Sequence, residues 1–357
     1  MSKKSKKASA KGASGKQPNE IIAFWNNKGG TGKTTLIFQS VLAYARAHPD
    51  SRVLVLDLCP QANFSELLLG GLVGRGGDRL IEIQARPHRP SVGGYFQTRL
   101  PQPYTTPSFD PHDYIIRPAD FSENVPDNVY MLAGDPLLEL QATAVSTLAN
   151  NQIPGSNPWL NVIDWLKDFV SPIRGDYDRT FIDCNPSFSI YTQIALSIAD
   201  SVVVPVMADD SSRRALQNAF SLIYGLHLPS PIYAQHSFAS KLKAENRELP
   251  RVHTIVKNRL TQYMGPASAY SAVLNSIDRQ VETLLQEKPE IFKFNKASNG
   301  MYEMRDFGTT GVVANAFGKS FHDVKENRYS IGQKRVAVRG ENLKLMRKAM
   351  SDLVQRL

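Results

Sequence analysis

The sequence predicts an α/β fold built on a doubly wound, mostly parallel sheet with helices on both faces. Short runs made almost entirely of apolar residues recur along the chain and alternate with stretches of helical character. Strands that show no polar alternation are buried on both faces, and this requires helices on either side of a parallel sheet. With 357 residues, of which 42% are hydrophobic, the chain can bury such a core as one large domain with insertions or as two domains.

The predicted elements follow one another in the order that this fold requires. A first strand at residues 21–25 ends in a glycine-rich turn, and a helix at residues 36–47 follows it. Further strands are predicted at residues 52–57, 180–183, 201–206 and 252–256. Because ligands bind at the carboxyl ends of parallel strands, the residues that end these strands are the first candidates for a functional site.

Two stretches depart from this alternation. Residues 1–19 are mostly Lys, Ser, Ala and Gly, and we predict a disordered basic tail, which either keeps the protein soluble or attracts nucleic acid. Residues 71–130 are rich in Gly, Pro, Arg and Tyr, and we predict an elaborated connection over the strand ends. The main domain is therefore predicted to cover residues 20–357, with a basic C-terminal segment at residues 319–357.

Charge and cysteine content exclude several classes of protein. The formal net charge of +9 is concentrated at the ends, because residues 1–20 carry +5 and residues 319–357 carry +6. Two cysteines, Cys59 and Cys184, exclude a disulfide framework and a cysteine-rich zinc module. No apolar run reaches the roughly 18 residues that cross a bilayer, and the first residues do not resemble a signal peptide. We therefore expect a soluble, cytoplasmic protein.

The turn after the first strand has the residues of a phosphate-binding loop. Glycines allow backbone N–H groups to converge on phosphate oxygens, a lysine neutralises their charge, and a hydroxyl binds Mg²⁺. The required strand, loop and helix occur here in that order, so the fold is expected to be of the P-loop NTPase type. The predicted nucleotide-binding residues of the loop are Lys28, Gly29, Gly30, Thr31, Gly32, Lys33, Thr34 and Thr35.

The loop has an unusual beginning. A standard P-loop starts with glycine at the position of Asn27, whereas here Lys28 precedes a glycine pair. This K-G-G-x-G-K-T-T form resembles the ParA/MinD/Soj family of deviant Walker A P-loop ATPases. Residues 53–65 resemble the second family motif, D-x-D-P-Q-x-N-x-S/T, and residues 177–187 resemble its switch II segment. The similarity covers most of the chain between residues 20 and 330.

The resemblance implies roles for individual residues. ATP and Mg²⁺ would be the cofactors, and Lys28 would reach across the interface of an ATP-bound homodimer to the partner's phosphates. Lys33 would hold the phosphates of its own chain, and Asp183 would hold Mg²⁺ through water. The predicted catalytic residues are Lys28, Lys33, Asp57 and Cys59, and the predicted metal-binding residues are Thr34, Asp57 and Asp183.

Cys59 is a departure from the family pattern. In the family, the second acid of D-x-D positions the hydrolytic water, and a thiol is a poor substitute for a carboxylate in that task. We hypothesise that ATP binding and dimerisation are intact, while hydrolysis is slow or uses Asp57, Asp183 or Asp209. The alternative is that Cys59 is a small buried residue and a different water geometry suffices.

Asn258 is a further candidate for nucleotide binding. It follows the predicted strand at residues 252–256, where an asparagine reads the nucleotide base in many relatives. An ordinary turn at the end of the strand explains the residue equally well, and both interpretations are kept.

The basic C-terminal segment predicts contact with DNA. Clustered Lys and Arg attract phosphate backbones through counterion release, without sequence preference. ParA-like proteins bind non-specific DNA through a basic C-terminal surface of the dimer, so the resemblance implies the same here, and a solvated basic face is the alternative. The predicted DNA-binding residues are Lys319, Lys325, Arg328, Lys334, Arg335, Arg339, Arg347 and Lys348.

The last residues have the apolar spacing of one helix face, formed by Leu343, Met346, Met350, Leu353 and Leu357. MinD relatives place such a helix on membranes. Because this helix is only moderately hydrophobic and lacks Trp and Phe, we expect it to pack on the core, with membrane binding as the less favoured alternative.

These observations lead to two main hypotheses of function. The first is an ATP-dependent switch in DNA partition or intracellular positioning, cytoplasmic and nucleoid-associated, which a separate ParB-like protein stimulates. The second is a hydrolysis-poor, ATP-held DNA-binding scaffold or regulator, which Cys59 suggests. A membrane-recruited, MinD-like positioning protein is a third.

Overall fold

The computed structural model describes residues 19–207, 209–260 and 267–357. The predicted basic tail lies outside the described residues except for Asn19, and for this residue the prediction was wrong. Asn19 is buried, and its side-chain amide donates a hydrogen bond to Thr180 Oγ1 at 3.0 Å. The ordered chain therefore begins at least one residue before the first strand.

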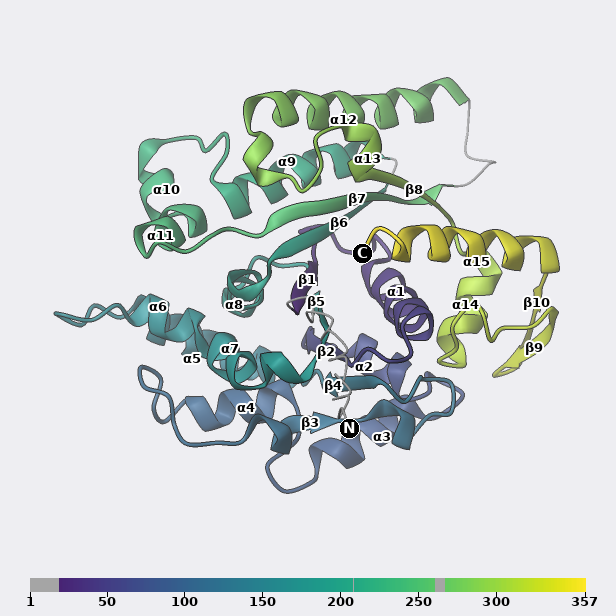
Figure 1. Ribbon diagram of the computed structural model, residues 1–357, viewed down its shortest axis with the longest axis horizontal. Helices are drawn as coiled ribbons and strands as arrows, with labels where there is room; N and C mark the ends of the chain where they lie inside the picture. The colour runs from purple at the N-terminus through teal and green to yellow at the C-terminus, as the bar shows by residue number, and fades with distance from the viewer. Residues whose placement is uncertain (1–18, 208, 261–266) are drawn as a thin grey trace, which may run out of the picture.

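An eight-stranded sheet runs through the centre of the molecule in the order β3-β4-β2-β5-β1-β6-β7-β8 (Figure 1). All neighbouring strands are parallel except the short edge strand β3, which pairs antiparallel with β4. The strands are β1 (Glu20–Phe24), β2 (Val53–Leu58), β3 (Ile115–Ile116), β4 (Val129–Leu132), β5 (Arg179–Cys184), β6 (Ser201–Met207), β7 (Arg251–Leu260) and β8 (Met301–Arg305). The predicted fold class is confirmed.

Helices cover both faces of the sheet, because successive side chains of a strand point to opposite sides. One face carries α1 (Lys33–Ala47), α2 (Asn63–Leu68), α3 (Gly76–Gln84), α14 (Gly308–Ala316) and α15 (Gly340–Val354). The other carries α4 (Val92–Arg99), α5 (Leu137–Asn150), α6 (Pro158–Ile163), α7 (Trp165–Val170), α8 (Ile190–Ile198), α9 (Asp210–Tyr224), α11 (Phe238–Ala244) and part of α12 (Ala267–Glu287). The short helix α13 (Ala297–Gly300) lies next to β7 and β8, and the short helix α10 (Pro231–His236) lies next to α11.

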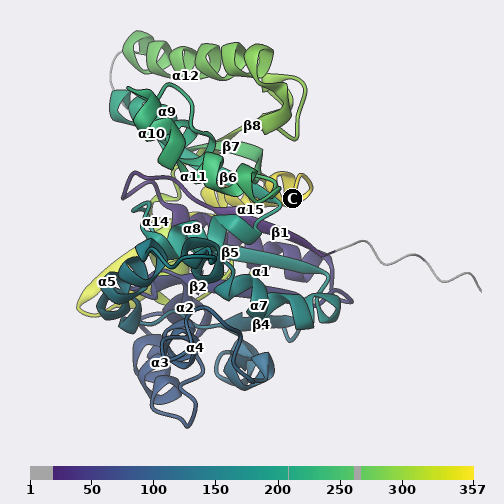
Figure 2. The same cartoon turned by 90° about the vertical axis from the view of Figure 1, so that its left-hand side faces the viewer.

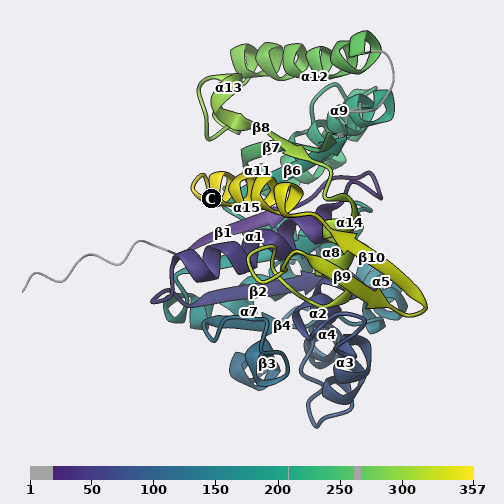
Figure 3. The same cartoon turned by 90° about the vertical axis from the view of Figure 1, so that its right-hand side faces the viewer.

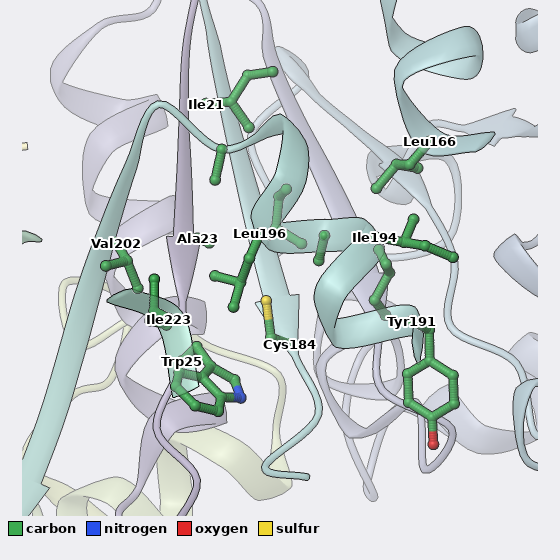
Figure 4. Packing of buried hydrophobic residues seen from close by; sticks show 14 of the residues in the cluster. Ile21, Ala23, Trp25, Leu166, Cys184, Tyr191, Ile194, Leu196, Val202 and Ile223 are labelled. Carbon is green, nitrogen blue, oxygen red and sulfur yellow. The ribbon is translucent and has the colours of Figure 1, made fainter. Parts of the chain in front are cut away.

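The first strand shows how the two cores divide. Ile22 and Phe24 belong to the apolar cluster beneath α1, whereas Ile21, Ala23 and Trp25 belong to the cluster beneath α8. Figure 4 shows the second group packed with side chains of α8. A strand that is apolar at every position is therefore needed to fill both layers.

Residues 71–130 contain more regular structure than a connection. They form α3, α4, the edge strand β3 and β4. The cause is an aromatic cluster in which Tyr95 of α4 contacts Phe109 and Phe169, with ring centroids 5.0 and 4.8 Å apart. Arg99, only 1% exposed, donates to Asp168 Oδ2 at 2.7 Å and so ties α4 to α7. Within the insertion, α4 therefore packs against the helices on the α8 face, whereas α3 packs on the α1 face.

The C-terminal segment was predicted as a helix that packs on the core, and the structure buries its apolar residues Leu343, Met346, Met350, Leu353 and Leu357. α15 lies along α1 (Figure 1). Ahead of it stands an antiparallel hairpin of β9 (Asn327–Ile331) and β10 (Lys334–Val338), which the sequence did not predict. Among the described residues, no helix is long and apolar enough to span a bilayer.

Glu20 at the start of β1 gives the fold a testable pH dependence. Its carboxylate accepts hydrogen bonds from Arg179 at 2.7 Å, from Ser201 at 2.8 Å and from Lys293. Burial opposes ionisation, but these hydrogen bonds and the charge of Lys293 outweigh it and lower the pKa of Glu20 from 4.5 to about 2. The resulting stabilisation is present above pH 4.5 and is lost as the pH falls towards 2.

We expect Glu20→Gln to remove about 1–2 kcal/mol of unfolding free energy at pH 7, after allowance for its partial exposure, and none near pH 2. Urea denaturation at several pH values measures this, with Glu282→Gln on the exposed side of α12 as the control. Parallel stability curves for Glu20→Gln and the natural protein between pH 2 and 7 would contradict the prediction.

Candidate functional site

The turn between β1 and α1 has a backbone suited to phosphate oxygens. Gly30 and Gly32 have φ angles of 75° and 76°, a left-handed conformation that favours glycine. A Cβ added at Gly29 or Gly30 would meet no described atom within 4 Å, so the loop faces open space. Gly32 caps α1 without a side-chain hydrogen bond, and the first turn of α1 has no acid. The first N–H groups of α1 are therefore left for an anion.

Lys33 and Thr34 meet Asp183 at the centre of the site. The Lys33 ammonium forms an ion pair with Asp183 Oδ1, and Thr34 Oγ1 donates to Asp183 Oδ2 at 3.2 Å. Burial alone would lower the pKa of Lys33, but the charge of Asp183 and its hydrogen bond outweigh burial and raise it. The structure thus brings together two of the three predicted metal-binding residues.

Asp57 lies beside Asp183, because β2 and β5 pair in that register. Its carboxylate accepts hydrogen bonds from Ser65 Oγ at 2.7 Å, from Ser65 N at 3.0 Å and from Cys59 N at 3.1 Å. Burial and the charge of Asp183 raise the pKa of Asp57 to about 7, against the effect of these hydrogen bonds. Asp57 therefore orders the turn after β2, a task that its motif position did not indicate.

Cys59 occupies the turn that Asp57 orders. It is 6% exposed, and burial, with the charges of Asp57 and Asp183, raises the pKa of its thiol to about 12. At neutral pH the thiol is protonated and uncharged, so it cannot accept a proton from water. Cys184 is fully buried and lies among the apolar side chains beneath α8 (Figure 4), so it is a packing residue.

Lys28 is held by a carboxylate of its own chain. Its ammonium donates to the two oxygens of Asp209 at 2.6 and 2.8 Å and to Ser212 Oγ at 3.2 Å. Asp209 also accepts from Ser212 N at 2.7 Å and so caps α9. Burial of Asp209 opposes its ionisation, but the hydrogen bonds from Lys28 and Ser212 outweigh burial and lower its pKa to about 2.

Three asparagines fix the loop to its surroundings. Asn258 on β7 is fully buried and donates to the carbonyl of Thr31 at 2.8 Å, so it contacts the loop itself. Asn26 donates to Pro205 O on β6 at 2.6 Å. Asn315 on α14 donates to Thr35 Oγ1 at 2.8 Å. Sequence reasoning missed Asn26 and Asn315. The position of Asn26, directly between a buried strand and the glycines, was the one available signal.

The predicted DNA-binding residues divide into two groups. Arg347 donates to the carbonyls of Phe321, His322 and Val324 at 2.9 to 3.1 Å, so it holds the chain together rather than facing solvent. Lys319 lies over the ring of Phe317. The exposed members are Lys325, Arg328, Lys334, Arg335, Arg339 and Lys348.

The β9–β10 hairpin carries three of these six exposed residues, Arg328, Lys334 and Arg335. Arg328 pairs with Ala337 and Ser330 with Arg335, so both arginines lie on one face of the hairpin. The opposite face, with Tyr329 and others, packs on the core. Figures 2 and 3 both place the hairpin on the side of the molecule where β1 ends and the phosphate loop begins.

Comparison with known proteins places these features in a family. A family model described as an AAA domain matches residues 19–76 and 127–228. The chain is 27% identical over 198 residues to the sporulation initiation inhibitor protein Soj of Bacillus subtilis, 53% of this chain and 59% of Soj. It is 29% identical over 195 residues to the chromosome partitioning protein ParA of Caulobacter vibrioides, 54% of this chain and 57% of that protein. These alignments thus span little more than half of each relative.

Solved structures show the same fold. An ATP complex of McdA from Cyanothece has a TM-score of 0.60 and 11% identity, covering 95% of this chain and 96% of that one. The ParA of pNOB8 bound to nonspecific DNA has a TM-score of 0.52 and 15% identity, covering 95% of each chain. At these identities the likeness concerns the fold alone. Together with the K-G-G-T-G-K-T-T loop and its neighbouring motifs, the comparisons show that the chain is similar to the ParA/Soj family of P-loop ATPases.

Proposed function

We propose that this protein is an ATP-dependent, dimerising switch that binds DNA without sequence preference, hydrolyses ATP slowly and acts in DNA partition or intracellular positioning. The observation that carries the slow hydrolysis is the buried Cys59, a thiol at the position where the family motif has an acid. Relatives named as chromosome partitioning proteins support the proposed role in DNA partition or positioning.

The open phosphate loop supports ATP and Mg²⁺ as cofactors. Backbone N–H groups of the loop and Lys33 would hold the phosphates, and Thr34 and Asp183 would hold Mg²⁺, which commonly takes few protein ligands beside phosphates and waters. Bound Mg²⁺ supplies charge neutralisation for the phosphates. Asp57, whose oxygens already accept three hydrogen bonds, would act by positioning the turn after β2.

Slow hydrolysis follows from the state of the acids around the site. The Cys59 thiol is protonated, so it cannot draw a proton from an attacking water. Asp57 is bound by Ser65, and Asp209 is bound by Lys28 and Ser212. Each alternative acid would have to leave its hydrogen bonds before it could orient a water molecule.

Dimerisation would depend on release of Lys28. In the proposed cycle, this lysine leaves Asp209 and pairs with the nucleotide phosphates of a second copy. The side chain of Lys28 is 23% exposed and that of Asp209 is 42% exposed, so the ion pair is accessible to a competing anion. ATP would then stabilise the dimer because only the dimer offers this contact.

DNA binding would use the exposed face of the β9–β10 hairpin. A two-stranded ribbon fits the major groove, and its arginines can contact phosphates without reading bases. Because the hairpin lies on the side of the phosphate loop, dimerisation would bring two such surfaces near each other. Nucleoid association and a separate ParB-like stimulating protein belong to the same proposal.

The second candidate is an ATP-held DNA-binding scaffold or regulator with almost no turnover. The state of Cys59 favours it as well. The two candidates differ in how long ATP remains intact, since a scaffold keeps it for hours and a slow switch releases it when stimulated.

The first prediction from the proposed function concerns Cys59→Asp. A carboxylate at this position restores a group that can orient water. ATP turnover should therefore rise by about 10²-fold, the lower end of the range for a positioned general base. Phosphate release with Mg²⁺ and duplex DNA measures turnover, and sedimentation measures dimerisation.

Two further variants make this test specific. Cys59→Asn has a similar size but no basic oxygen, so its turnover should stay at the natural level. Lys28→Ala should bind ATP yet remain monomeric. Equal turnover in the natural protein, Cys59→Asp and Cys59→Asn would contradict the proposal that the Cys59 thiol makes hydrolysis slow. ATP binding that does not alter dimerisation would contradict the proposed ATP-dependent switch.

Asn258 lies within β7, which runs to Leu260, so the interpretation as a turn at the strand end was wrong. The second prediction separates base reading by Asn258 from positioning of the loop through Thr31. If its amide positions the loop through Thr31, Asn258→Ala should weaken ATP and GTP equally, by about fivefold to tenfold for a lost buried hydrogen bond. Titration with fluorescent nucleotides measures this, with the exposed Asn342→Ala as control. A loss of affinity for ATP alone would show instead that Asn258 reads the base.

The third prediction concerns the hairpin. Replacing Arg328 and Arg335 by serine should weaken binding of every DNA sequence alike, and should flatten the dependence of log affinity on log salt by about 0.9 per lost phosphate contact. The matched control replaces Lys288 and Lys296 by serine, because both are exposed and lie outside the hairpin. An unchanged salt dependence would show that the hairpin does not contact DNA.

A further inference from the structure

A groove with apolar walls lies beside the start of α8, on a flank of the molecule. Figure 2 shows the elements that frame it, with α10 and α11 above α8 and α5. Its volume is about 670 Å³. Side chains of Trp159, Phe188 and Phe238 line it on the core side, and α10 contributes Ile232 and Tyr233. We call this the α8 groove.

The outer wall of the α8 groove exposes large apolar side chains. Ile232 is 68% exposed and Tyr233 is 60% exposed, and α10 has no buried residue. Apolar side chains that stand together on a short helix in this way leave apolar surface in contact with water, which a binding partner would cover.

The floor of the α8 groove has an unsatisfied polar group. Ser189 Oγ is buried and has no hydrogen-bond partner among the described residues. Ser189 is the N-cap of α8, yet its side chain makes no capping bond, and the first turn of α8 carries no acid. A buried hydroxyl without a partner is costly, and an uncapped helix start attracts negative charge. This end of the groove is therefore suited to a carboxylate.

A cation stands on the wall of the same groove. The Lys241 ammonium lies 5.1 Å from the ring centroid of Trp159, and within the described ranges it has no carboxylate partner. Its partial burial lowers the pKa of Lys241. An ammonium that has lost some water without gaining a counterion gains from a carboxylate placed beside it. Apolar walls and two groups that favour an anion thus occur together.

We propose that the α8 groove binds an acidic, amphipathic peptide segment of a partner protein. Its apolar side chains would lie between Ile232 and Phe188, and a carboxylate would accept hydrogen bonds from Lys241 and Ser189. The volume matches a few side chains of one helical segment, and the charge selects an acidic one.

The groove is connected to the phosphate loop through aromatic contacts. Phe188 lies 5.3 Å from Trp25 and 5.7 Å from Phe238, measured between ring centroids. Trp25 directly precedes the loop, and its Nε1 donates to Asn185 O at 3.0 Å, within the segment that follows Asp183. A segment bound in the groove would contact Phe188 and, through Trp25, alter the position of the phosphate loop. This coupling rests on the proposed function, whereas binding itself does not.

Binding is tested on the full chain without nucleotide. The probe is a fluorescein-labelled twelve-residue peptide with Leu and Phe at helical spacing and Glu between them, and the control peptide has Gln for Glu. The natural protein should bind the Glu peptide about tenfold more tightly by fluorescence anisotropy, because a charge-assisted hydrogen bond is lost in the control. Lys241→Gln should abolish this preference.

A pair of matched surface variants locates the apolar contact. Ile232→Ser should weaken both peptides about tenfold, whereas Ile81→Ser, on an equally exposed isoleucine of α3, should change neither. Failure of both peptides to bind, or binding that Lys241→Gln and Ile232→Ser leave unchanged, would overturn the proposal. Sedimentation with anionic vesicles that Ile232→Ser abolishes would also overturn it, since it would assign this flank to a membrane.

The coupling has a readout of its own. With fluorescent ATP preloaded, the Glu peptide should change the rate of nucleotide release. Trp25→Phe, which removes the hydrogen bond to Asn185 O outside the groove lining, should reduce that effect while leaving peptide binding within about twofold. A bound peptide that does not alter release overturns the coupling to the loop. A failure of the proposed ATP switch would instead appear as absent nucleotide binding, with peptide affinity intact.

Discussion

Two buried carboxylates that end neighbouring strands set the constraint around which the site is built. β2 and β5 pair with Asp57 beside Asp183, and both side chains are fully buried. Negative charges repel strongly where water is excluded, so each needs a counter-charge or hydrogen bonds. Lys33 neutralises Asp183, while Ser65 and the backbone of Cys59 bind Asp57. The strand register, the phosphate loop and the turn after β2 therefore depend on one another.

The same constraint gives a physical reason for a cysteine at the end of β2. A carboxylate at residue 59 would add a third negative charge close to Asp57 and Asp183, with Lys33 as the nearby cation. A neutral thiol avoids that repulsion and keeps a small side chain in the turn. On the proposed function, the protein thereby gains a stable nucleotide site and loses the group that would orient water. Stability of the site and speed of hydrolysis are then opposed at one position.

The fold could be predicted where burial produces a recognisable pattern in consecutive residues of the sequence. Strands covered on both faces are apolar throughout, so β1 and β2 were placed within one residue of their observed bounds. Residues 71–130 and the β9–β10 hairpin lack such a local pattern. Tyr95 packs on Phe169, far along the chain, and the hairpin alternates exposed and half-buried residues beside many charges. Contacts between segments that are distant in the sequence stabilise these elements, and local periodicity does not predict such contacts.

The site shows a second limit, since motifs name residues but not the state that each one adopts. Lys28 and Asp209 stand 181 positions apart, and the motifs that assign both to the site do not predict that the two side chains pair. In this structure the lysine is bound within its own chain, yet its motif position implies a task across a dimer. Both can hold if the two arrangements compete. A triphosphate offers more negative charge and more acceptor oxygens than one carboxylate. Two copies would then dimerise only when the interaction of Lys28 with the ATP of the partner is more favourable than its ion pair with Asp209.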